Sequence, residues 1–407
     1  MTLVNNTQTT VAVIGGGMIT HDQILPSLYE LQRNSVIGEI QICGQRSSTL
    51  RSLVESPALQ RAFPGQSFVA FPPLDDTSET PQPRLYEQVV RALPEQSIVI
   101  VALPDHLHKE AILYALRCNQ HVITVKPLVL SSADSGEIEE EARKRGLLVA
   151  VEFHKRFDDR SLMARDKYRN GMFGEFRLGT AALFEKWYYR RSNFQNWCTT
   201  ENSDAFTYIG CHYVDLVHFI TGLMPVSVSV CGIVDRYPNG NSGYLWTDAR
   251  VRWNNGAILN VQNGLSFPDE GPGTNKQGIT LYCASRDTGA FLSHDDQYRG
   301  MQYCYISRPQ APGSTVYSEP SADYFQYVNL GGNGLKPVGY GYRSIEFLVQ
   351  QCLTARSKSD LAARQAFLRA TDETGIVATP ANSRYNEAVI EAARLSITSD
   401  GREVAIR

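Results

Sequence analysis

Residues 11–20 read Val-Ala-Val-Ile-Gly-Gly-Gly-Met-Ile-Thr, and this stretch indicates the fold of the first half of the chain. The four apolar residues are typical of a short strand that is buried on both faces of a parallel sheet. The glycines predict a turn whose backbone can approach a pyrophosphate, and the N–H groups of a following helix would attract that charge. We therefore predict a dinucleotide-binding turn formed by Gly15, Gly17, Met18 and Ile19.

The glycine motif is incomplete, because Thr20 stands at the position of its third glycine. Three glycines can also form a tight turn and nothing more, so the surrounding elements matter. The pattern predicts further strands at 40–43, 97–102, 121–125 and 147–151, separated by helices that include 109–117 and 137–144. Parallel strands joined by helices form a Rossmann-type, doubly wound α/β domain, whose ligand lies at the carboxyl ends of the strands.

The end of the second strand bears on the choice of cofactor. An acidic residue there would hydrogen-bond the ribose of NAD, whereas an arginine can pair with the 2′-phosphate of NADP. Gln45 and Arg46 stand at this place. Arg46 favours NADP, but Gln45 can serve a ribose hydroxyl and a solvent-exposed strand end would look the same, so NAD stays open.

The second half of the chain has a different pattern. Longer strands are expected over 176–184, 226–234, 249–253 and 257–262, with a hairpin turn at Asn255 and Gly256. We predict a dinucleotide-binding domain over 1–150 and an α+β substrate and oligomerisation domain over 151–407. The large sheet of the second domain is expected to be mostly antiparallel, with one open face that could join a homo-oligomer, a dimer or tetramer. Residues 270–276 and 307–320 are expected to be loops.

Residues 101–127, Val-Ala-Leu-Pro-Asp-His-Leu-His through Val-Ile-Thr-Val-Lys-Pro, carry the most specific pattern in the chain. They closely resemble the Gfo/Idh/MocA oxidoreductases, which have a strand, a Pro-x-x-x-His helix start and a strand that ends in Glu-Lys-Pro. The resemblance implies that Leu103, Pro104, His108 and Pro127 lie at the cofactor and that Lys126 is catalytic.

Lys126 can also be argued from its position alone. A lysine that closes an apolar strand at the carboxyl edge of the sheet can donate a hydrogen bond to a reacting oxygen. A solvated lysine at a strand end is the alternative, which the adjoining Pro127 disfavours. Val125 departs from the usual glutamate of the family. His108 is expected to organise the loop and helix start rather than to transfer protons.

Residues 208–216, Tyr-Ile-Gly-Cys-His-Tyr-Val-Asp-Leu, match the second family pattern, which has Asp, then Gly-x-His, then Asp-Leu. The resemblance implies that His212 is the acid–base residue near the substrate carbon, and a neutral imidazole suits that role. Asp215, three residues later on a helix, could contact this ring or cap the backbone. Tyr208 replaces the first aspartate and either relays a proton or packs as an aromatic residue. The segment Asn202-Ser203-Asp204-Ala205 stands where the family usually has a glycine-rich run, and this change together with Tyr208 predicts an altered substrate pocket, in which Asp204 is a candidate for substrate binding.

Two further segments are candidates for substrate contact. His154 and Lys155 occupy the expected domain junction, where the family often has Asn-x-Arg-Phe. Trp187 begins a segment dense in aromatic and cationic residues that suits the C–H face of a sugar. A packed loop or an oligomer contact would have the same composition.

Composition excludes several classes of protein. The chain has 407 residues, 39 Lys and Arg against 42 Asp and Glu, and a formal net charge of -3. No basic run indicates nucleic-acid binding, and no apolar run is long enough to cross a membrane. The N-terminal stretch lacks a secretory pattern, so we expect a cytoplasmic protein. The eight cysteines and the histidines lack the spacing of a disulfide framework or a metal site, and no metal is expected.

Three functions are consistent with these residues. The first is an NAD(P)-dependent dehydrogenase that moves hydride between nicotinamide and a secondary hydroxyl or ketone of a sugar, polyol or related cyclic compound. The second is redox-neutral sugar processing, in which transient oxidation allows elimination or epimerisation. The third is a non-catalytic dinucleotide sensor, which the presence of both Lys126 and His212 argues against.

Overall fold

The computed structural model describes residues 8–78, 80–271, 275–286, 289–295, 306–307, 315–316 and 324–407. Within this part, the chain forms two compact units, and each is described by itself. Unit 1 contains residues 1–128, 133–152 and 327–382. Unit 2 contains residues 129–132, 153–326 and 383–407. The assignment of cofactor to 1–150 and substrate to 151–407 stays a prediction.

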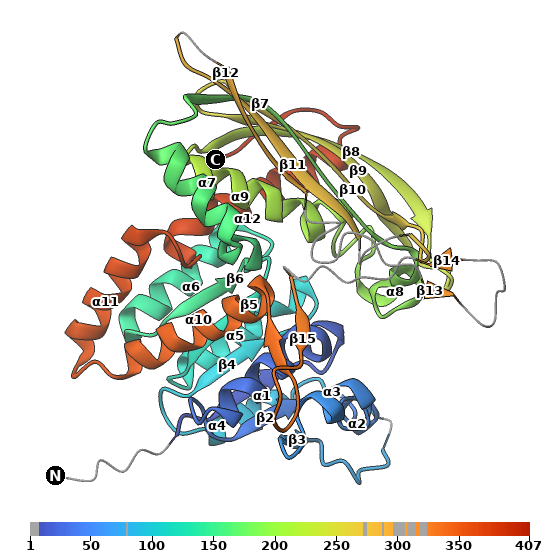
Figure 1. The fold of residues 1–407 in the computed structure, drawn as a ribbon, viewed down its shortest axis with the longest axis vertical. Coiled ribbons are helices and arrows are strands. Elements are labelled where there is room, and N and C mark those ends of the chain that lie inside the picture. Colours follow the sequence, from blue (N-terminus) through green and yellow to red (C-terminus); the bar gives the residue numbers. More distant parts are fainter. Residues whose placement is uncertain are drawn as a thin grey trace. The chain divides into compact units, whose positions relative to one another are not determined.

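Unit 1 is built on a parallel sheet of six strands in the order β3-β2-β1-β4-β5-β6 (Figure 1). Its strands are β1 (Val11–Ile14), β2 (Ile40–Cys43), β3 (Val69–Phe71), β4 (Ile98–Val101), β5 (His121–Val125) and β6 (Val149–Glu152). The order runs outward in both directions from β1 and β4, as a doubly wound fold requires. The predicted Rossmann domain is therefore confirmed. The strand β3 was missed, because three residues carry too little periodicity to stand out.

Helices cover this parallel sheet. They are η1 (Thr20–Ile24), α1 (Leu25–Arg33), α2 (Ser47–Val54), α3 (Pro57–Ala62), α4 (Leu85–Ala92), η2 (Asp105–Leu107), α5 (His108–Arg117), α6 (Ser132–Arg145), α10 (Tyr340–Arg356) and α11 (Leu361–Thr374). Ile24 at the end of η1 and Leu25 and Leu28 in α1 are fully buried. The helix α10 comes from late in the chain but packs on β5, β6 and α1, so two distant segments build this unit.

Unit 2 contains a seven-stranded sheet in the order β12-β11-β7-β10-β9-β8-β17. Its strands are β7 (Glu175–Lys186), β8 (Pro225–Arg236), β9 (Ser242–Trp253), β10 (Ile258–Phe267), β11 (Asn275–Ala284), β12 (Gly289–Asp295) and β17 (Val404–Ala405). All neighbours are antiparallel except β7 and β10. The expected mostly antiparallel sheet is confirmed, and so is the hairpin at Asn255 and Gly256 between β9 and β10.

One face of the second sheet is covered by helices and the other is open (Figure 1). The helical segments of this unit are η3 (His154–Phe157), α7 (Asp159–Arg169), η4 (Trp187–Arg191), α8 (Phe194–Trp197), η5 (Phe206–Gly210), α9 (Cys211–Thr221) and α12 (Pro380–Ile397). Leu259 and Val261 on β10 are buried while Gln262 is exposed, as their alternation predicts.

The expected loops are described only in part. Of residues 270–276, positions 272–274 lie outside the described residues, and Asn275 and Lys276 already belong to β11. Residues 306–307 and 315–316 pair as short strands, β13 (Ile306–Ser307) and β14 (Thr315–Val316). The remainder of the loop expected over 307–320 lies outside the described part of the chain. The strands β15 (Gln326–Val328) and β16 (Lys336–Val338) form a second short pair.

Candidate functional site

The glycine turn follows β1 directly, and each glycine has a different environment. Gly15 has φ +113°, and a Cβ there would lie 2.1 Å from the carbonyl oxygen of Ala102. A Cβ at Gly17 would meet nothing within 4 Å, so open space lies beside its backbone. The first helical hydrogen bonds run from Thr20 N and His21 N to Gly17 O, which leaves the amides of Met18 and Ile19 in the first turn. These features fit a pyrophosphate, because they combine close backbone access with helix N-terminal amides.

Thr20, which replaces the third glycine, takes part in the turn. Its hydroxyl donates a hydrogen bond of 2.7 Å to the carbonyl oxygen of Gly15, and the residue is fully buried. The threonine therefore closes the turn instead of obstructing it.

Gln45 and Arg46 lie between β2 and α2. The carbonyl of Gln45 accepts a hydrogen bond of 2.9 Å from the amide of Gln82, and its side chain is exposed. Arg46 is half-buried and precedes the first residue of α2, Ser47. Arg46 thus stands at the helix start that follows the second strand.

His108 connects two loops at the carboxyl edge of the parallel sheet. Its Nε2 lies 2.8 Å from the carbonyl oxygen of Leu103, and its Nδ1 lies 2.8 Å from the carbonyl oxygen of Pro127. The ring is fully buried. Its contacts agree with the expected organising role, since the ring joins the Pro104 loop to the residues that follow Lys126. Direct contact of Leu103, Pro104, His108 or Pro127 with a cofactor stays a prediction.

Lys126 follows the last residue of β5 and is 9% exposed. The peptide bond between Lys126 and Pro127 is cis. Because β4 lies between β1 and β5 and all three are parallel, the carboxyl ends of β1 and β5 meet at one edge. The structure therefore brings Lys126 and the glycine turn to the same sheet edge, as expected from the sequence.

In unit 2, His212 and His154 lie against each other. Their ring centroids are 4.7 Å apart with a tilt of 46°. Phe153 meets the His212 ring edge-on at 6.1 Å, and Tyr324 contacts the His154 ring at 5.2 Å. His212 is 5% exposed. Two residues that were predicted separately, one acid–base and one substrate-binding, thus belong to one cluster.

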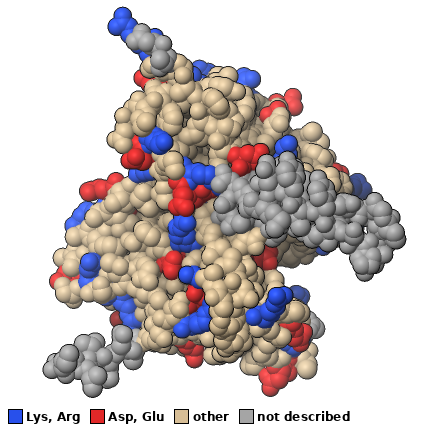
Figure 2. All heavy atoms as spheres, viewed as in Figure 1, with Lys and Arg blue, Asp and Glu red and all other residues tan. Residues whose placement is uncertain are grey.

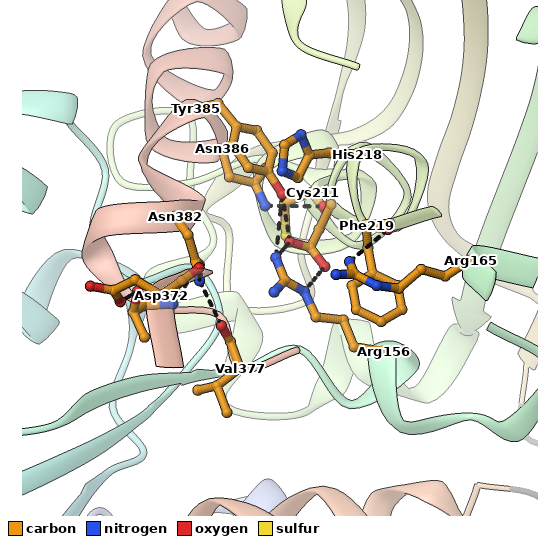
Figure 3. Close-up of polar contacts among 12 residues, drawn as sticks. Arg156, Arg165, Cys211, His218, Phe219, Asp372, Val377, Asn382, Tyr385 and Asn386 are labelled. Carbon is orange, nitrogen blue, oxygen red and sulfur yellow. Dashed lines mark hydrogen bonds and ion pairs between the residues drawn. The ribbon is translucent and has the colours of Figure 1, made fainter. Parts of the chain in front are cut away.

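Asp215 pairs with Arg156, which the sequence analysis did not single out (Figure 3). Arg156 Nε and Nη2 donate to the two carboxylate oxygens at 2.8 and 2.6 Å, and the Tyr385 hydroxyl donates at 2.9 Å. Both charged groups are about 2% exposed. The carboxylate therefore serves this ion pair rather than the His212 ring or a backbone cap. Its partner lies 59 residues away, and no local pattern could have revealed it.

The pKa values of Arg156, Tyr385 and His218 are set by burial and by the neighbouring Asp215 carboxylate. Burial alone would lower the pKa of Arg156, but the charge and hydrogen bonds of Asp215 raise it above its ordinary value. Burial and the neighbouring Asp215 charge raise the pKa of Tyr385 well above its usual range. His218, whose ring stacks on Tyr385 at 4.1 Å, has its pKa lowered by burial. Burial thus favours the neutral forms of Tyr385 and His218 beside the ion pair.

Lys155 points toward the sheet of its own unit. Its ammonium donates to the side-chain oxygen of Gln277 on β11 and lies 5.4 Å from the centroid of the Tyr213 ring. The residue is 3% exposed. Its expected contact with substrate stays a prediction.

Tyr208, Trp187 and Asp204 have different surroundings. The Tyr208 ring contacts Phe194 at 4.6 Å and Trp197 at 5.7 Å, so aromatic packing is one of its roles. Trp187 is 40% exposed and stacks on the guanidinium of Arg190 at 4.0 Å. Asp204 is buried, and its carboxylate accepts hydrogen bonds from the amide and hydroxyl of Thr207 at the start of η5. The proton relay through Tyr208 and the substrate contacts of these residues stay predictions.

On the face shown in Figure 2, most of the surface is tan, and blue and red groups lie next to one another where charged side chains gather. Over the described residues, no three His, Cys, Asp or Glu side chains are gathered as a metal site would need. No helix in the same part of the chain combines the length and hydropathy needed to cross a membrane.

Two family models match the chain. Residues 9–153 match the model described as the oxidoreductase family with NAD-binding Rossmann fold. Residues 161–283 match the Gfo/Idh/MocA C-terminal domain. The chain belongs to the Gfo/Idh/MocA oxidoreductase family. The resemblance that the sequence motifs carried is thereby confirmed.

Individual Gfo/Idh/MocA relatives match this chain over only part of its length. The D-glucoside 3-dehydrogenase of Escherichia coli K12 is 25% identical over 221 residues, which cover 53% of this chain and 55% of that protein. The 2,7-anhydro-N-acetylneuraminate hydratase of the same organism is 27% identical over 134 residues, or 33% of this chain and 36% of the hydratase. The chain thus spans about half the length, or less, of these relatives.

A solved structure shows the same fold over nearly the whole length. It is that of GenD2 from gentamicin A biosynthesis in complex with NAD, with a TM-score of 0.66 and 16% identity. The likeness covers 98% of this chain and 97% of GenD2. At this identity the comparison supports the two-part architecture alone.

Proposed function

We propose that this chain moves hydride between a nicotinamide dinucleotide and a secondary hydroxyl or ketone of a sugar, polyol or related cyclic compound. The observation that carries the proposal is the position of Lys126, largely buried at the sheet edge that also holds the glycine turn. When bound, the nicotinamide would accept hydride during oxidation and return it during reduction. Membership in an NAD-binding oxidoreductase family supports this assignment.

The side chains divide the remaining work. The Lys126 ammonium donates a hydrogen bond to the substrate oxygen, which stabilises negative charge that develops there. His212 accepts the hydroxyl proton as the alcohol is oxidised and returns it in the opposite direction. The Tyr208 hydroxyl is a second proton carrier one turn away. His154, Lys155, Trp187 and Asp204 are the proposed substrate-binding residues.

For the cofactor we favour NADP over NAD. Arg46 stands beside the start of α2, and no acidic residue occupies positions 44–47. A guanidinium suits a 2′-phosphate, because it makes charge-assisted hydrogen bonds with planar geometry. NAD stays the alternative that the test must separate.

The test is turnover by the full chain with NAD and NADP supplied separately. D-Glucosides come first in the panel because of the similarity to D-glucoside 3-dehydrogenase, followed by other sugars and inositols. We expect reduced cofactor with at least one compound, and a loss of roughly 10²–10⁴-fold in kcat/KM in Lys126→Ala. Absence of reduced cofactor across the panel, or full activity of Lys126→Ala, would contradict the proposal.

A second candidate is redox-neutral processing, in which hydride returns to the same substrate molecule. The similarity to a hydratase of 2,7-anhydro-N-acetylneuraminate favours it, and so does the replacement of the family aspartate by Tyr208. It predicts a cofactor that copurifies with the protein and product formation without net reduced cofactor. Stoichiometric release of reduced cofactor would exclude it.

We also propose that the open face of the second sheet binds another copy of this chain. Leu178, Tyr282 and Phe291 are 47%, 53% and 66% exposed. They lie side by side on β7, β11 and β12, because Tyr282 pairs with Leu178 on one side and with Phe291 on the other. Such an apolar row favours a protein contact. Tyr282→Asp with Phe291→Asp should lower the mass measured by light scattering, and an unchanged mass would contradict this interface.

A further inference from the structure

Gly210, two residues before His212, is a glycine that its own backbone does not require. It ends the π-helix η5 and directly precedes α9, with φ -63° and ψ -30°, which any L-amino acid adopts readily. A glycine at a helical position lowers stability relative to alanine, because glycine loses more conformational freedom on folding. The glycine therefore has a reason other than backbone conformation.

That reason is the close approach of Asn263 and Phe206. The π-helix η5 packs on β10, and a Cβ on Gly210 would lie 2.7 Å from the side-chain oxygen of Asn263. It would also lie 2.5 Å from the ring of Phe206, which is fully buried in the same π-helix. Real Cβ atoms essentially never come so close to another atom, so glycine is the residue that fits between η5 and the sheet.

Asn263 is itself unfavourable for folding. It lies on the buried face of β10, together with Leu259 and Val261, and it is 1% exposed. Among the described residues, neither the nitrogen nor the oxygen of its carboxamide has a hydrogen-bond partner. The hydroxyl of Thr247, its antiparallel neighbour on β9, is buried and lacks a partner in the same part of the chain. Unpaired buried polar atoms destabilise a protein, so an apolar residue would suit this position better for folding.

Three locally unfavourable features thus meet just before His212. They are a π-helical turn, a glycine at a helical position and an unpaired buried amide. Such features concentrate at functional sites, where stability is given up for a required geometry. Because η5 continues directly into α9, the depth at which Gly210 rests on Asn263 sets the position of the first turn of α9, which carries His212.

We infer that Asn263 is a positioning residue for His212. Gly210 rests on its carboxamide, and this contact holds the first turn of α9 at the distance from the sheet that the proton-accepting ring needs. Because the side chain is 1% exposed, it acts through the backbone of η5 rather than by touching substrate. This inference rests on the proposed function for the role of His212, but a displacement of the ring can be measured without turnover.

The first test compares Asn263→Leu with Gln262→Leu. Gln262 is the preceding residue of β10 and is exposed on the opposite face, so its replacement is the matched control. In Asn263→Leu we expect kcat to fall roughly 10- to 100-fold with little change in KM, because a displaced reacting group costs rate rather than binding. The thermal unfolding midpoint should equal or exceed that of the wild type, since an unpaired amide leaves the core. A lower midpoint with unchanged kcat would make Asn263 a purely structural residue.

A double-variant cycle tests the contact itself and needs no added bulk at Asn263. Gly210→Ala places a methyl group where Asn263 obstructs it, so we expect kcat to fall roughly tenfold or more. In the Asn263→Ala background one of the two obstructions is gone, and the same methyl group should cost a smaller factor. Equal factors in the two backgrounds would contradict the contact.

A measurement without turnover separates this inference from the proposed function. NMR signals of ¹³C-labelled histidine rings are recorded at one pH, and His212→Phe identifies the signal of His212. This signal depends on the orientation of the ring toward Phe153, so we expect Asn263→Leu to shift it and to leave the signal of His121 in unit 1 unchanged. Gln262→Leu should leave both signals in place.

An unshifted His212 signal in Asn263→Leu would overturn the inference. If that signal shifts while the wild type turns over no compound, the proposed function fails and the positioning of His212 by Asn263 stands.

Discussion

The guanidinium of Arg156 makes two hydrogen bonds to the carboxylate of Asp215, and both groups are about 2% exposed. The pair joins η3 to α9, and the Tyr385 hydroxyl on α12 completes the carboxylate's bonding. Figure 3 shows the Arg156 side chain reaching toward Tyr385 and His218. These three side chains thus connect segments that are far apart in the sequence. One of the segments, η3, carries His154, and another, α9, carries His212.

Removing one partner of this ion pair should be costly. We expect Asp215→Asn to lower the free energy of unfolding by about 3–5 kcal/mol, because it leaves the Arg156 charge buried without a counter-ion. Chemical denaturation measures the loss. Glu175→Gln is the matched control, since its partner Arg177 and Glu175 are both more than half exposed, and a change within about 1 kcal/mol is expected there. Equal losses in the two variants would contradict the account.

The two glycines of the turn should respond differently to an added methyl group. Gly17→Ala should fold as the wild type does, because its Cβ would meet no protein atom within 4 Å. If a pyrophosphate lies beside that backbone, the same variant should lose cofactor affinity by roughly tenfold or more, measured by calorimetry. Gly15→Ala should instead lose stability, since its Cβ would lie 2.1 Å from Ala102 O. Full cofactor affinity in Gly17→Ala would place the pyrophosphate elsewhere.

Arg46 should set the preference between the two dinucleotides. We expect Arg46→Ala to weaken NADP binding by roughly 10- to 100-fold, the worth of a charge-assisted hydrogen bond of about 1.5–3 kcal/mol. NAD affinity should change little, because NAD lacks the 2′-phosphate. The ratio of the two dissociation constants is the readout. Equal weakening of both cofactors would mean that Arg46 supports the loop rather than the phosphate.

His121 should make stability depend on pH. Burial, with smaller contributions from Arg364 and Arg356, lowers its pKa from 6.5 to about 3. The unfolded chain then binds a proton at higher pH than the folded chain, so stability is full above about pH 6.5 and is lost as pH falls toward 3. His121→Asn should flatten the dependence of unfolding free energy over this window. An equally steep dependence in the variant would assign it to other groups.

The sequence predicted the structural elements that are determined by residues close to one another in the chain. Strand β1 and the glycine turn were visible because buried β-branched residues end at consecutive glycines. The hairpin at Asn255 and Gly256 followed from turn chemistry, and Gly256 adopts φ +84° there. Lys126 could be placed at the sheet edge, because parallel strands joined by helices put their carboxyl ends together.

What could not be predicted depends on contacts between distant segments. The packing of α10 on β5 and β6, and the Arg156–Asp215 pair, leave no local periodicity to detect. The contact of His154 with His212 spans 58 positions of the chain, and only folding of η3 against α9 creates it. Asp204 is a local feature that the prediction missed. Its carboxylate accepts a hydrogen bond from the amide of Thr207, only three residues later in the chain.

The central claim is hydride transfer between the substrate carbon and the nicotinamide, with Lys126 at the reacting oxygen. Its most direct test uses the sugar or polyol that turns over, deuterated at its ring carbons, and mass spectrometry of the dinucleotide after reaction. The account predicts deuterium on the nicotinamide with the wild type and a loss of that transfer in Lys126→Ala. Product formation by the wild type with no deuterium ever reaching the dinucleotide would contradict it.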